Sequence, residues 1–427
     1  GAMAGTLVTG CGGSSSGSSS ESSSDSKEAS DSSSSNSNGA AEVTLWHYFE
    51  HEAPDLEAVA EKYNESQDKI HVTCTYVSRE ELMNQYTIGA VSGELPDIGM
   101  VDSPDMESYI SLGVFEDITD DIKDWDELDQ FYDGPLSSCM DADGKYYGLP
   151  NNSNCLTLCC NMDILNAAGI ENPPTTWEEF EEDCQKIADQ GEIPVIVGGS
   201  DAWQLMRYLS FSPWRVTGPE FIEGYQAGTD SFSDNESAKY AVNLLSDLGT
   251  KGYFEPGFAS VDFTSACNLF FGGSGAIFYT GSGQISLAEE MYDNGELGFF
   301  PVPDTEGMDN MSTNVPVHAG FAEGFNKATY DDTMQEFFDY MCENFTDACY
   351  NQAQVFSPFN EELPEGLPQL YYDTQPMFED AETAWTSWDD KLDSDVMTKI
   401  VDEQQQLAQG IIKPDEFIKT CDSLVKK

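Results

Sequence analysis

The segment His47–His51, with the order His-x-x-Glu-His, carries residue types that readily bind zinc. In this order they form the inverted zinc-protease motif, which requires both histidines on one face of a helix, with the glutamate near the metal. Here the segment leaves the apolar run Val43–Trp46, which is typical of a β-strand, and Pro54 lies just beyond it. The sequence therefore argues against a metallopeptidase.

A second possible ligand set, Asp141-Ala142-Asp143-Gly144, resembles half of a calcium-binding loop but lacks the ligand that such a loop needs at its twelfth position. We therefore expect a hairpin turn at these residues. No nucleophile elbow, phosphate-binding loop, dinucleotide fingerprint or Cys-x-x-Cys pair occurs in the sequence. We accordingly expect no cofactor, no zinc knuckle and no thioredoxin-like redox site.

Strand and helix patterns alternate after the first 42 residues, and these elements must position any site. Val43–Trp46, Ile70–Tyr76 and Asp97–Val101 read as strands, because they are short apolar runs or alternate between apolar and polar residues. Between them, apolar residues recur at helical spacing, and Ser78 with Glu81 forms a capping box. This order predicts an α/β fold with a largely parallel sheet and helices on both faces.

A second α/β unit is expected to begin near Asn151. It contains an expected strand over Cys155–Cys160, followed by a helix that Thr176 and Glu179 open as a capping box. A further strand is expected over Ile193–Val197. Later helices are expected around residues 238–248, around residues 334–345 and after residue 414.

Length and charge bound the kinds of ligand. About 385 residues (427 less the first 42) follow the serine-rich start, which is more than one ordinary core holds and suits two lobes. The net charge is −60, from 78 acidic and 18 basic residues, so the surface repels nucleic acid and anionic lipid. The same charge disfavours anionic ligands. Neutral or cationic ligands remain.

The cysteines have irregular spacings. Ten of the eleven lie beyond the serine-rich start. Cys159 and Cys160 are neighbours on an expected strand, so their side chains point to opposite faces and we expect them to act as small core residues. Cys342 and Cys349 are about 10 Å apart if they lie on one helix. That separation is too long for a disulfide.

The N-terminal residues resemble a membrane-anchoring signal. Leu7-Val8-Thr9-Gly10-Cys11, followed directly by a serine-rich tract, resembles the lipobox of bacterial lipoproteins, which implies that Cys11 is lipidated. The basic start and most of the apolar part of a signal peptide are missing, and Gly1-Ala2-Met3 resembles the remnant of a cleaved tag. We therefore expect residues 1–11 to be a tag remnant with the end of a signal sequence.

Residues 12–42 are rich in Ser, Asn, Asp and Gly, which bury too little apolar area to fold, so we expect a disordered tether. Such a chain spans roughly 30 Å and holds a folded body close to a membrane. No run of 18 or more apolar residues follows Cys11, so the sequence predicts no membrane-spanning helix.

Four stretches of the remaining chain occur in a recognisable order. They are Ser92–Ile98, Gly113–Ile118, the block from Asp143 to Phe180, and Gly273–Gly283 followed by Phe299–Pro303. The block is the most specific, because it joins Asp-Gly-Lys-Tyr-Tyr-Gly-Leu-Pro, Asn-Met-Asp-Ile-Leu-Asn-Ala-Ala-Gly-Ile and Pro-Thr-Thr-Trp-Glu-Glu-Phe. Their order and spacing resemble the extracellular solute-binding proteins, family 1, of carbohydrate ABC importers, and the resemblance covers essentially the whole body.

This resemblance implies a two-lobed periplasmic-binding-protein-like α/β fold, with discontinuous lobes joined by hinge strands and a ligand held between them. We expect lobe one to comprise residues 43–150 plus 297–329, and lobe two residues 151–296 plus 330–427. Ligands of open α/β sheets bind at the carboxyl ends of the strands. Closure would be a hinge motion that the ligand favours through its contacts with both lobes.

In this group the ligand contacts follow strand ends, and sugars are held by flat aromatic rings and by polar side chains that bond their hydroxyls. The resemblance therefore implies contacts after the first and third strands, at the crossing into lobe two, in irregular parts of lobe two, and shortly before the final helices. The candidate ligand-binding residues are Tyr48, Glu50, His51, Asp102, Asn152, Asn154, Trp203, Trp214, Tyr279, Gly281, Trp385 and Trp388.

For each candidate tryptophan the alternative is a place in the core, and Trp125 and Trp177 read as helix-packing residues. Two positions depart from the maltose-binding members of the group. Asn152 stands where they carry an acidic contact, and Val101 stands where they carry a stacking aromatic. The resemblance therefore leaves the identity of the sugar open.

The resemblance implies a monomeric, non-enzymatic lipoprotein on the outer face of the bacterial cytoplasmic membrane. It would bind a neutral oligosaccharide, of three or more units, and deliver it to ABC transporter permease subunits, touching the membrane only through its lipid anchor and binding no nucleic acid. Two alternatives stay open. The same fold could bind a polyamine, or ferric iron through Tyr371 and Tyr372, although neighbours on a strand point apart. A glycosidase would need two carboxylates at a defined separation.

Overall fold

The computed structural model describes residues 39–48, 54–92, 95–102, 105–123, 126–141, 143–311, 317–318, 320–379, 388 and 392–425. Residues 40–427 form one compact unit. The expected lipidation site Cys11, nearly all of the tether 12–42, and the candidate residues Glu50, His51 and Trp385 lie outside the described residues. In the described part, no helix combines the length and the apolar character that a membrane crossing requires.

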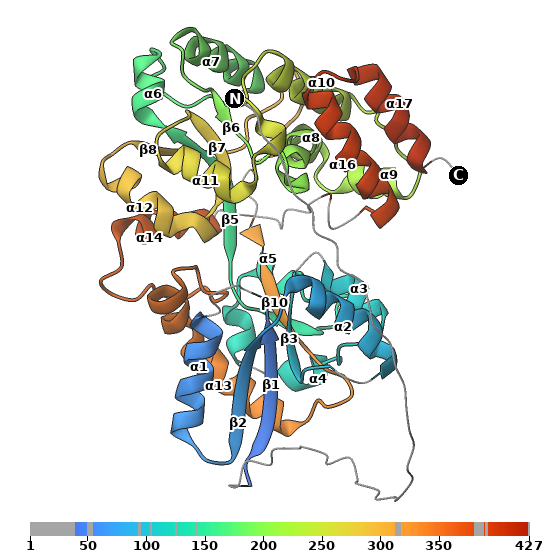
Figure 1. The fold of residues 1–427 in the computed structure, drawn as a ribbon, viewed down its shortest axis with the longest axis vertical. Coiled ribbons are helices and arrows are strands. Elements are labelled where there is room, and N and C mark those ends of the chain that lie inside the picture. Colours follow the sequence, from blue (N-terminus) through green and yellow to red (C-terminus); the bar gives the residue numbers. More distant parts are fainter. Residues whose placement is uncertain are drawn as a thin grey trace, which may run out of the picture. The chain divides into compact units, whose positions relative to one another are not determined.

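The first sheet has five strands in the order β2-β1-β3-β10-β4. Strand β1 runs parallel to β2 and β3, whereas β10 is antiparallel to β3 and β4. Figure 1 shows helices α1 and α13 on one side of this sheet and α2 and α3 on the other. The bounds are β1 Ala41–His47, α1 Pro54–Ser66, β2 Ile70–Tyr76, α2 Arg79–Ser92, β3 Ile98–Asp102, α3 Met106–Ser111, β4 Gly148–Pro150, β10 Phe321–Phe325 and α13 Asp332–Ala348.

Local sequence signals explain several of these elements. Val43 and Leu45 alternate with more exposed residues along β1, so one side of the strand enters the core. The carboxylate of Asp97 accepts hydrogen bonds from the backbone N–H of Thr44 at 2.8 Å and from its hydroxyl at 2.9 Å, which ties β1 to the start of β3. The expected cap of α2 is present, because the Ser78 hydroxyl accepts from the N–H of Glu81 at 3.1 Å.

The second sheet has the strand order β6-β7-β5-β8, and β9 also pairs with β5. Strands β6 and β7 are parallel, whereas β5 is antiparallel to β7, β8 and β9. The strands are β5 Asn154–Asn161, β6 Val195–Ile196, β7 Ile277–Gly281, β8 Leu297–Phe300 and β9 Val317–His318.

The helices of the second sheet form two separate cores on its two faces. Leu156, Leu158 and Cys160 on β5 face one core, and Cys155 and Cys159 face the other. The prediction that Cys159 and Cys160 point to opposite faces is confirmed, and ten described cysteines are free thiols. The long helices of the first core are α7 Trp177–Asp189, α8 Ala202–Thr217, α10 Glu236–Thr250, α16 Ser394–Ala408 and α17 Pro414–Val425, with α6 Met162–Ala167 and α9 Glu220–Gln226 beside them; the second core has α11 Phe263–Phe271, α12 Ile285–Asp293, α14 Gln369–Thr374 and α15 Pro376–Glu379.

The capping box of α7 is present in full, because Thr176 accepts from the N–H of Glu179 while the Glu179 carboxylate accepts from the N–H of Thr176. The Glu179 carboxylate also accepts two hydrogen bonds from Thr175, and these bonds hold the pKa of Glu179 below its usual value. The four residues Thr176–Glu179 are therefore sufficient to predict where α7 begins.

Three features differ from the sequence expectations. The sheets are mixed rather than largely parallel. Strand β10 runs antiparallel to β3 in the first sheet, and β5 runs antiparallel to β7 and β8 in the second. The strand expected over Ile193–Val197 is only two residues long, at Val195–Ile196. Finally, β8 pairs with β5 in the second sheet and α13 packs on the first, which is the reverse of the lobes expected for residues 297–300 and 330–348.

Aromatic packing explains the position of α13. The ring of Phe337 lies 5.2 Å from that of Tyr63 on α1, and the ring of Phe338 lies 5.0 Å from that of Phe325 on β10. These contacts place the apolar stripe of α13 in the core of the first sheet. The stripe was visible in the sequence, but its partner was not.

Candidate functional site

Three side chains meet where strands of the first sheet end. Tyr48 directly follows β1, Asp102 is the last residue of β3, and Phe321 opens β10, where its backbone pairs with Asp102. The Tyr48 hydroxyl donates a hydrogen bond to the Asp102 carboxylate, and the Tyr48 and Phe321 rings pack edge to face at 6.0 Å. We call Tyr48, Asp102 and Phe321 the edge cluster. All three are half-buried, so each keeps part of its surface exposed.

Asn152 joins the edge cluster from the segment that leads out of β4. Its side-chain oxygen accepts hydrogen bonds from the N–H of Gly320 at 3.0 Å and from the N–H of Phe321 at 3.4 Å. The structure therefore brings together three of the predicted residues, Tyr48, Asp102 and Asn152, and gives Asn152 a role in holding Phe321. The cluster offers an aromatic ring, a carboxylate and an amide at one edge of a sheet.

Two more predicted residues meet in the second sheet. The side-chain oxygen of Asn154 accepts from the hydroxyl of Ser282 at 3.3 Å and from the N–H of Gly283 at 3.3 Å. A Cβ atom at Gly281 would lie 2.4 Å from the same oxygen, so only glycine permits this approach. Gly281 thus has a structural reason to be glycine, independent of any ligand.

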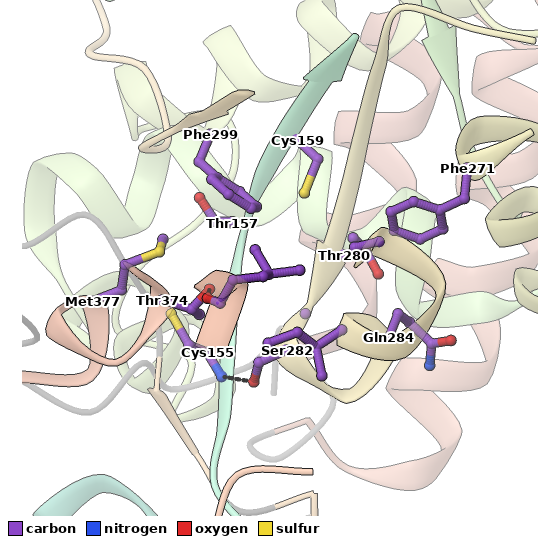
Figure 2. Close-up of a pocket in the computed structure, with 14 residues that line it drawn as sticks. Cys155, Thr157, Cys159, Phe271, Thr280, Ser282, Gln284, Phe299, Thr374 and Met377 are labelled. Atoms are coloured by element: carbon purple, nitrogen blue, oxygen red, sulfur yellow. Dashed lines mark hydrogen bonds between the residues drawn. The ribbon is translucent and has the colours of Figure 1, made fainter. Parts of the chain in front are cut away.

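A small pocket lies beside Ser282, between the second sheet and helices α12, α14 and α15 (Figure 2). Thr157 and Thr280, neighbours across β5 and β7, point into it, and the dashed line of Figure 2 marks the bond from the N–H of Cys155 to the Ser282 hydroxyl at 3.0 Å. Its volume is about 30 Å³, which suits a few water-sized groups but not a sugar ring. Burial raises the pKa of the thiols of Cys155 and Cys159, so both stay protonated.

Three predicted aromatic contacts lie in the core instead. Trp214, Tyr279 and Trp388 are each at most 2 % exposed, so their rings have no free face for a sugar in this structure. Trp388 packs against Phe221 and Phe232, with ring centroids 5.6 and 5.7 Å apart. Trp214 and Trp388 therefore occupy the core positions that were the alternative to ligand contact, and Tyr279 packs edge to face on Phe211 of α8 at 4.9 Å.

Trp203 has a mixed position. Its half-buried ring packs edge to face on Phe263 at 5.0 Å, and the guanidinium of Arg207 lies 5.4 Å from its centroid. These contacts cover part of the ring, as in other cation–π pairs. Trp177 is buried and stacks on Phe211, which confirms the packing role expected from the sequence.

The two sequence patterns that resemble metal sites lie in other local structures than those sites require. His47 ends strand β1 rather than lying on a helix, and its buried imidazole lies 3.2 Å from the Glu57 carboxylate. Asp141 accepts from the N–H groups of Asp143 and Lys145, which confirms the hairpin turn. Within the described residues, no group of three or more His, Cys, Asp or Glu side chains is arranged to hold a metal.

The tyrosine pair proposed for iron lies on a helix, not on a strand. Tyr371 and Tyr372 belong to α14, and Tyr371 is buried. The Tyr372 hydroxyl donates to the carbonyl of Pro364 at 2.6 Å and accepts from the N–H of Leu367 at 3.3 Å. The two hydroxyls are therefore not arranged around one metal position.

Phe321 is a site residue that is not among the candidates expected from the sequence. Its signal is the alternation of Phe321, Glu323 and Phe325 with small residues, which is typical of a strand. The pairing of that strand with β3, which brings Phe321 to Asp102, depends on contacts far apart in the sequence.

Comparison with known proteins agrees with this architecture. The family model described as bacterial extracellular solute-binding protein matches residues 50–344. The sn-glycerol-3-phosphate-binding periplasmic protein UgpB of Yersinia pestis is 24 % identical over 350 residues, covering 78 % of this chain and 78 % of that protein.

Two solved structures show the same fold over nearly the whole chain. A chitin oligosaccharide binding protein matches with a TM-score of 0.76 at 20 % identity, covering 90 % of this chain and 98 % of that one. The solute-binding protein RafE in complex with raffinose matches with a TM-score of 0.70 at 18 % identity, covering 91 % and 99 %. The two-lobed α/β fold expected from the sequence is thereby confirmed.

Proposed function

Since this chain belongs to the bacterial extracellular solute-binding proteins, we propose that it captures neutral oligosaccharides between its two lobes and delivers them to the permease of an ABC importer. The observation that carries the proposal is the edge cluster, where an aromatic pair and a carboxylate lie side by side at the carboxyl ends of β1 and β3. Ring faces suit the C–H surfaces of sugars, and a carboxylate accepts hydrogen bonds from their hydroxyls.

Each residue of the site has a proposed role. Tyr48 and Phe321 would contact the sugar ring, and Asp102, oriented by the Tyr48 hydroxyl, would accept from sugar hydroxyls. Asn152 would keep Phe321 in place. The second lobe would add polar contacts from Asn154 near Gly281, and Trp203 and Trp385 remain proposals for stacking.

We further propose that the protein is a monomeric lipoprotein held to the outer face of the membrane through Cys11, with residues 12–42 as its tether. The lobes would be divided near residue 150, where β4 leads into β5. The acidic net charge of −60 keeps the body away from anionic lipid, so the anchor alone would contact the membrane.

A second candidate ligand is sn-glycerol-3-phosphate, because UgpB proteins of Yersinia are 24–26 % identical to this chain over 350 residues. The net charge of −60 opposes a phosphate ligand. Polyamines and ferric iron suit the charge, but Tyr371 and Tyr372 lie side by side in the sequence on α14, and the Tyr372 hydroxyl already donates to the carbonyl of Pro364.

A thermal-shift panel separates these candidates. It contains chitin oligosaccharides, raffinose, sn-glycerol-3-phosphate, spermidine and ferric citrate, each in millimolar excess. A ligand that binds only the folded state stabilises it, by about 4 kcal/mol when its concentration is 1,000 times its Kd. This stabilisation raises the melting temperature. We expect a rise with one neutral oligosaccharide class. A rise with the phosphate, spermidine or iron alone would contradict the proposal.

A further inference from the structure

Glu323 is a buried carboxylic acid that the proposed ligand site does not use. It lies in the middle of β10, between Met100 on β3 and Leu149 on β4, and its side chain is fully buried. Neither of its carboxylate oxygens has a hydrogen-bond partner of normal geometry among the described residues. A Cβ at Gly148 would lie 2.4 Å from the Glu323 carbonyl oxygen, so β4 packs closely against this strand.

Two buried side chains act most directly on Glu323. Asp55, buried in the first turn of α1, is the main charge acting on it, while the buried amide of Asn151 is the polar neighbour that favours its ionised form. The strand register puts His47 of β1 on the same face of the sheet as Glu323. The thiols of Cys74, Cys139 and Cys349 also interact electrostatically with Glu323. The titratable groups that interact here are Asp55, Glu57, His47, Cys74, Tyr86, Cys139 and Cys349.

Burial and the nearby Asp55 carboxylate raise the pKa of Glu323 well above its usual value, and the Asn151 amide only partly opposes this. Burial also raises the pKa of Asp55, to about 6. Burial thus disfavours the charged form of both acids, and the Asp55 charge disfavours it further at Glu323. Ionising Glu323 as well would place two negative charges in a core that supplies no cation from the groups acting on it.

The residues that leave β4 are tied to β10 next to this acid. The N–H of Asn151 donates to the Phe321 carbonyl at 3.0 Å, and the Asn152 side chain accepts from Gly320 and Phe321. The thiol of Cys349 donates to the Asn151 carbonyl at 3.9 Å. We call residues 151–153 the crossing segment, because they connect the first sheet to β5 of the second.

We propose that Glu323 is a positioning residue whose fully buried side chain stays uncharged, and that this uncharged state lets the crossing segment stay packed against β10, where Asn152 holds Phe321 of the edge cluster. Loss of the proton would leave an unpaired buried charge, which is stabilised only if water reaches it. The adjacent strand β4 has only three residues, so we expect it to separate from β10 first. The crossing segment would then loosen, and with it the position of Phe321. The effect on ligand binding rests on the proposed function, but the protonation of Glu323 does not.

Hydrogen exchange of the ligand-free protein tests the proton without any ligand. The amides to follow are those of Asn151, Gly320 and Phe321, compared at each pH between wild type and Glu323→Gln, which mimics the neutral acid. We expect equal exchange at about pH 6. Above the pKa of Glu323 the wild type should exchange faster, by about tenfold more for each further pH unit. Equal exchange across the alkaline range would overturn the proposal.

Two further variants serve as controls for the hydrogen-exchange experiment. Asp55→Asn removes the charge that opposes ionisation, so the wild-type transition should move to lower pH, and a transition that stays in place would contradict the assignment. Glu255→Gln is the matched control, because Glu255 is another buried acid with a raised pKa, of about 7, and it lies by the second sheet, where it accepts from the N–H of Val197. It should leave the exchange profile of Asn151 unchanged.

An infrared difference spectrum identifies the proton directly. At neutral pH the wild type should show a protonated-carboxyl C=O band that Glu323→Gln lacks. Absence of that band in the wild type would mean that Glu323 is ionised, which would also overturn the proposal. Neither outcome depends on whether an oligosaccharide binds, so a failed ligand panel and a failed proton assignment remain distinguishable.

Discussion

At the scale of single residues, the Tyr48–Asp102 pair is the most specific feature of the proposed site. A hydrogen bond to a charged acceptor orients the carboxylate before any ligand arrives, and this lowers the entropy lost on binding. Tyr48 follows β1 and Asp102 ends β3; these strands are neighbours in the sheet, although β2 lies between them in the sequence. The sequence named both residues, but only the fold shows that they touch.

Removing this hydrogen bond should weaken binding while leaving the fold intact. We expect Tyr48→Phe, and separately Asp102→Asn, to reduce affinity for the captured oligosaccharide by about tenfold to a hundredfold, in calorimetric titration. Tyr76→Phe, at the exposed end of β2, is the control and should bind like wild type. Unchanged affinity in both site variants would remove the edge cluster from the binding site.

Trp388 was a candidate for stacking on a ligand, but its ring is buried. Its position near the final helices suggested stacking on a ligand, yet it is buried against two phenylalanines of the second lobe. We therefore expect Trp388→Ala to cost about 3–5 kcal/mol of unfolding free energy, measured by denaturant titration. Trp203→Ala, at a half-buried ring, should cost clearly less; a larger loss there would reverse this ranking.

At the scale of elements, the sequence predicted those with strong local signals. The α7 capping box, the alternation of β2 and the turn at Asp141 are set by neighbouring residues, and all three were predicted. The partner of a strand or helix is not a local property. The pairing of β8 with β5 and the packing of α13 on α1 depend on contacts across more than 100 residues, so the sequence alone misassigned both.

The approach of β7 to β5 depends on Gly281. An alanine Cβ there would lie 2.4 Å from the Asn154 side-chain oxygen and 2.7 Å from a methyl of Leu156. We expect Gly281→Ala to destabilise the protein by about 1–3 kcal/mol in thermal or denaturant unfolding.

Gly283→Ala provides the matched control for that substitution. Its Cβ would meet the same Asn154 oxygen only at 4.0 Å, which is ordinary contact. Its stability should stay near that of wild type. Equal losses in the two variants would show that general loss of glycine, not the close approach, sets the cost.

At the scale of the whole molecule, buried acids and surface charge both favour mildly acidic conditions. Burial raises the pKa of Asp55 to about 6 and of Glu255 to about 7, and raises that of Glu323 well above its usual value. The folded state therefore holds protons that the unfolded state has already lost above about pH 4. The net charge of −60 adds repulsion as the remaining carboxylates ionise.

Stability should therefore fall as the pH rises from about 4 through 7, with Asp55 alone contributing about 3 kcal/mol. We expect a higher melting temperature at about pH 5 than at about pH 8. Below about pH 4 the acids whose pKa is lowered by hydrogen bonds, Glu179 and Asp262, lose their stabilising charge. A melting temperature that rises steadily toward pH 8 would contradict this account.

The central claim is that a neutral oligosaccharide binds at the edge cluster. Its most direct test is a calorimetric titration of wild type and Asp102→Asn, side by side, with chitin oligosaccharides, raffinose and sn-glycerol-3-phosphate. The account predicts saturable binding of a neutral oligosaccharide by wild type and at least about tenfold weaker binding by the variant. Binding of the phosphate alone, or equal binding of the oligosaccharide by both proteins, would contradict it.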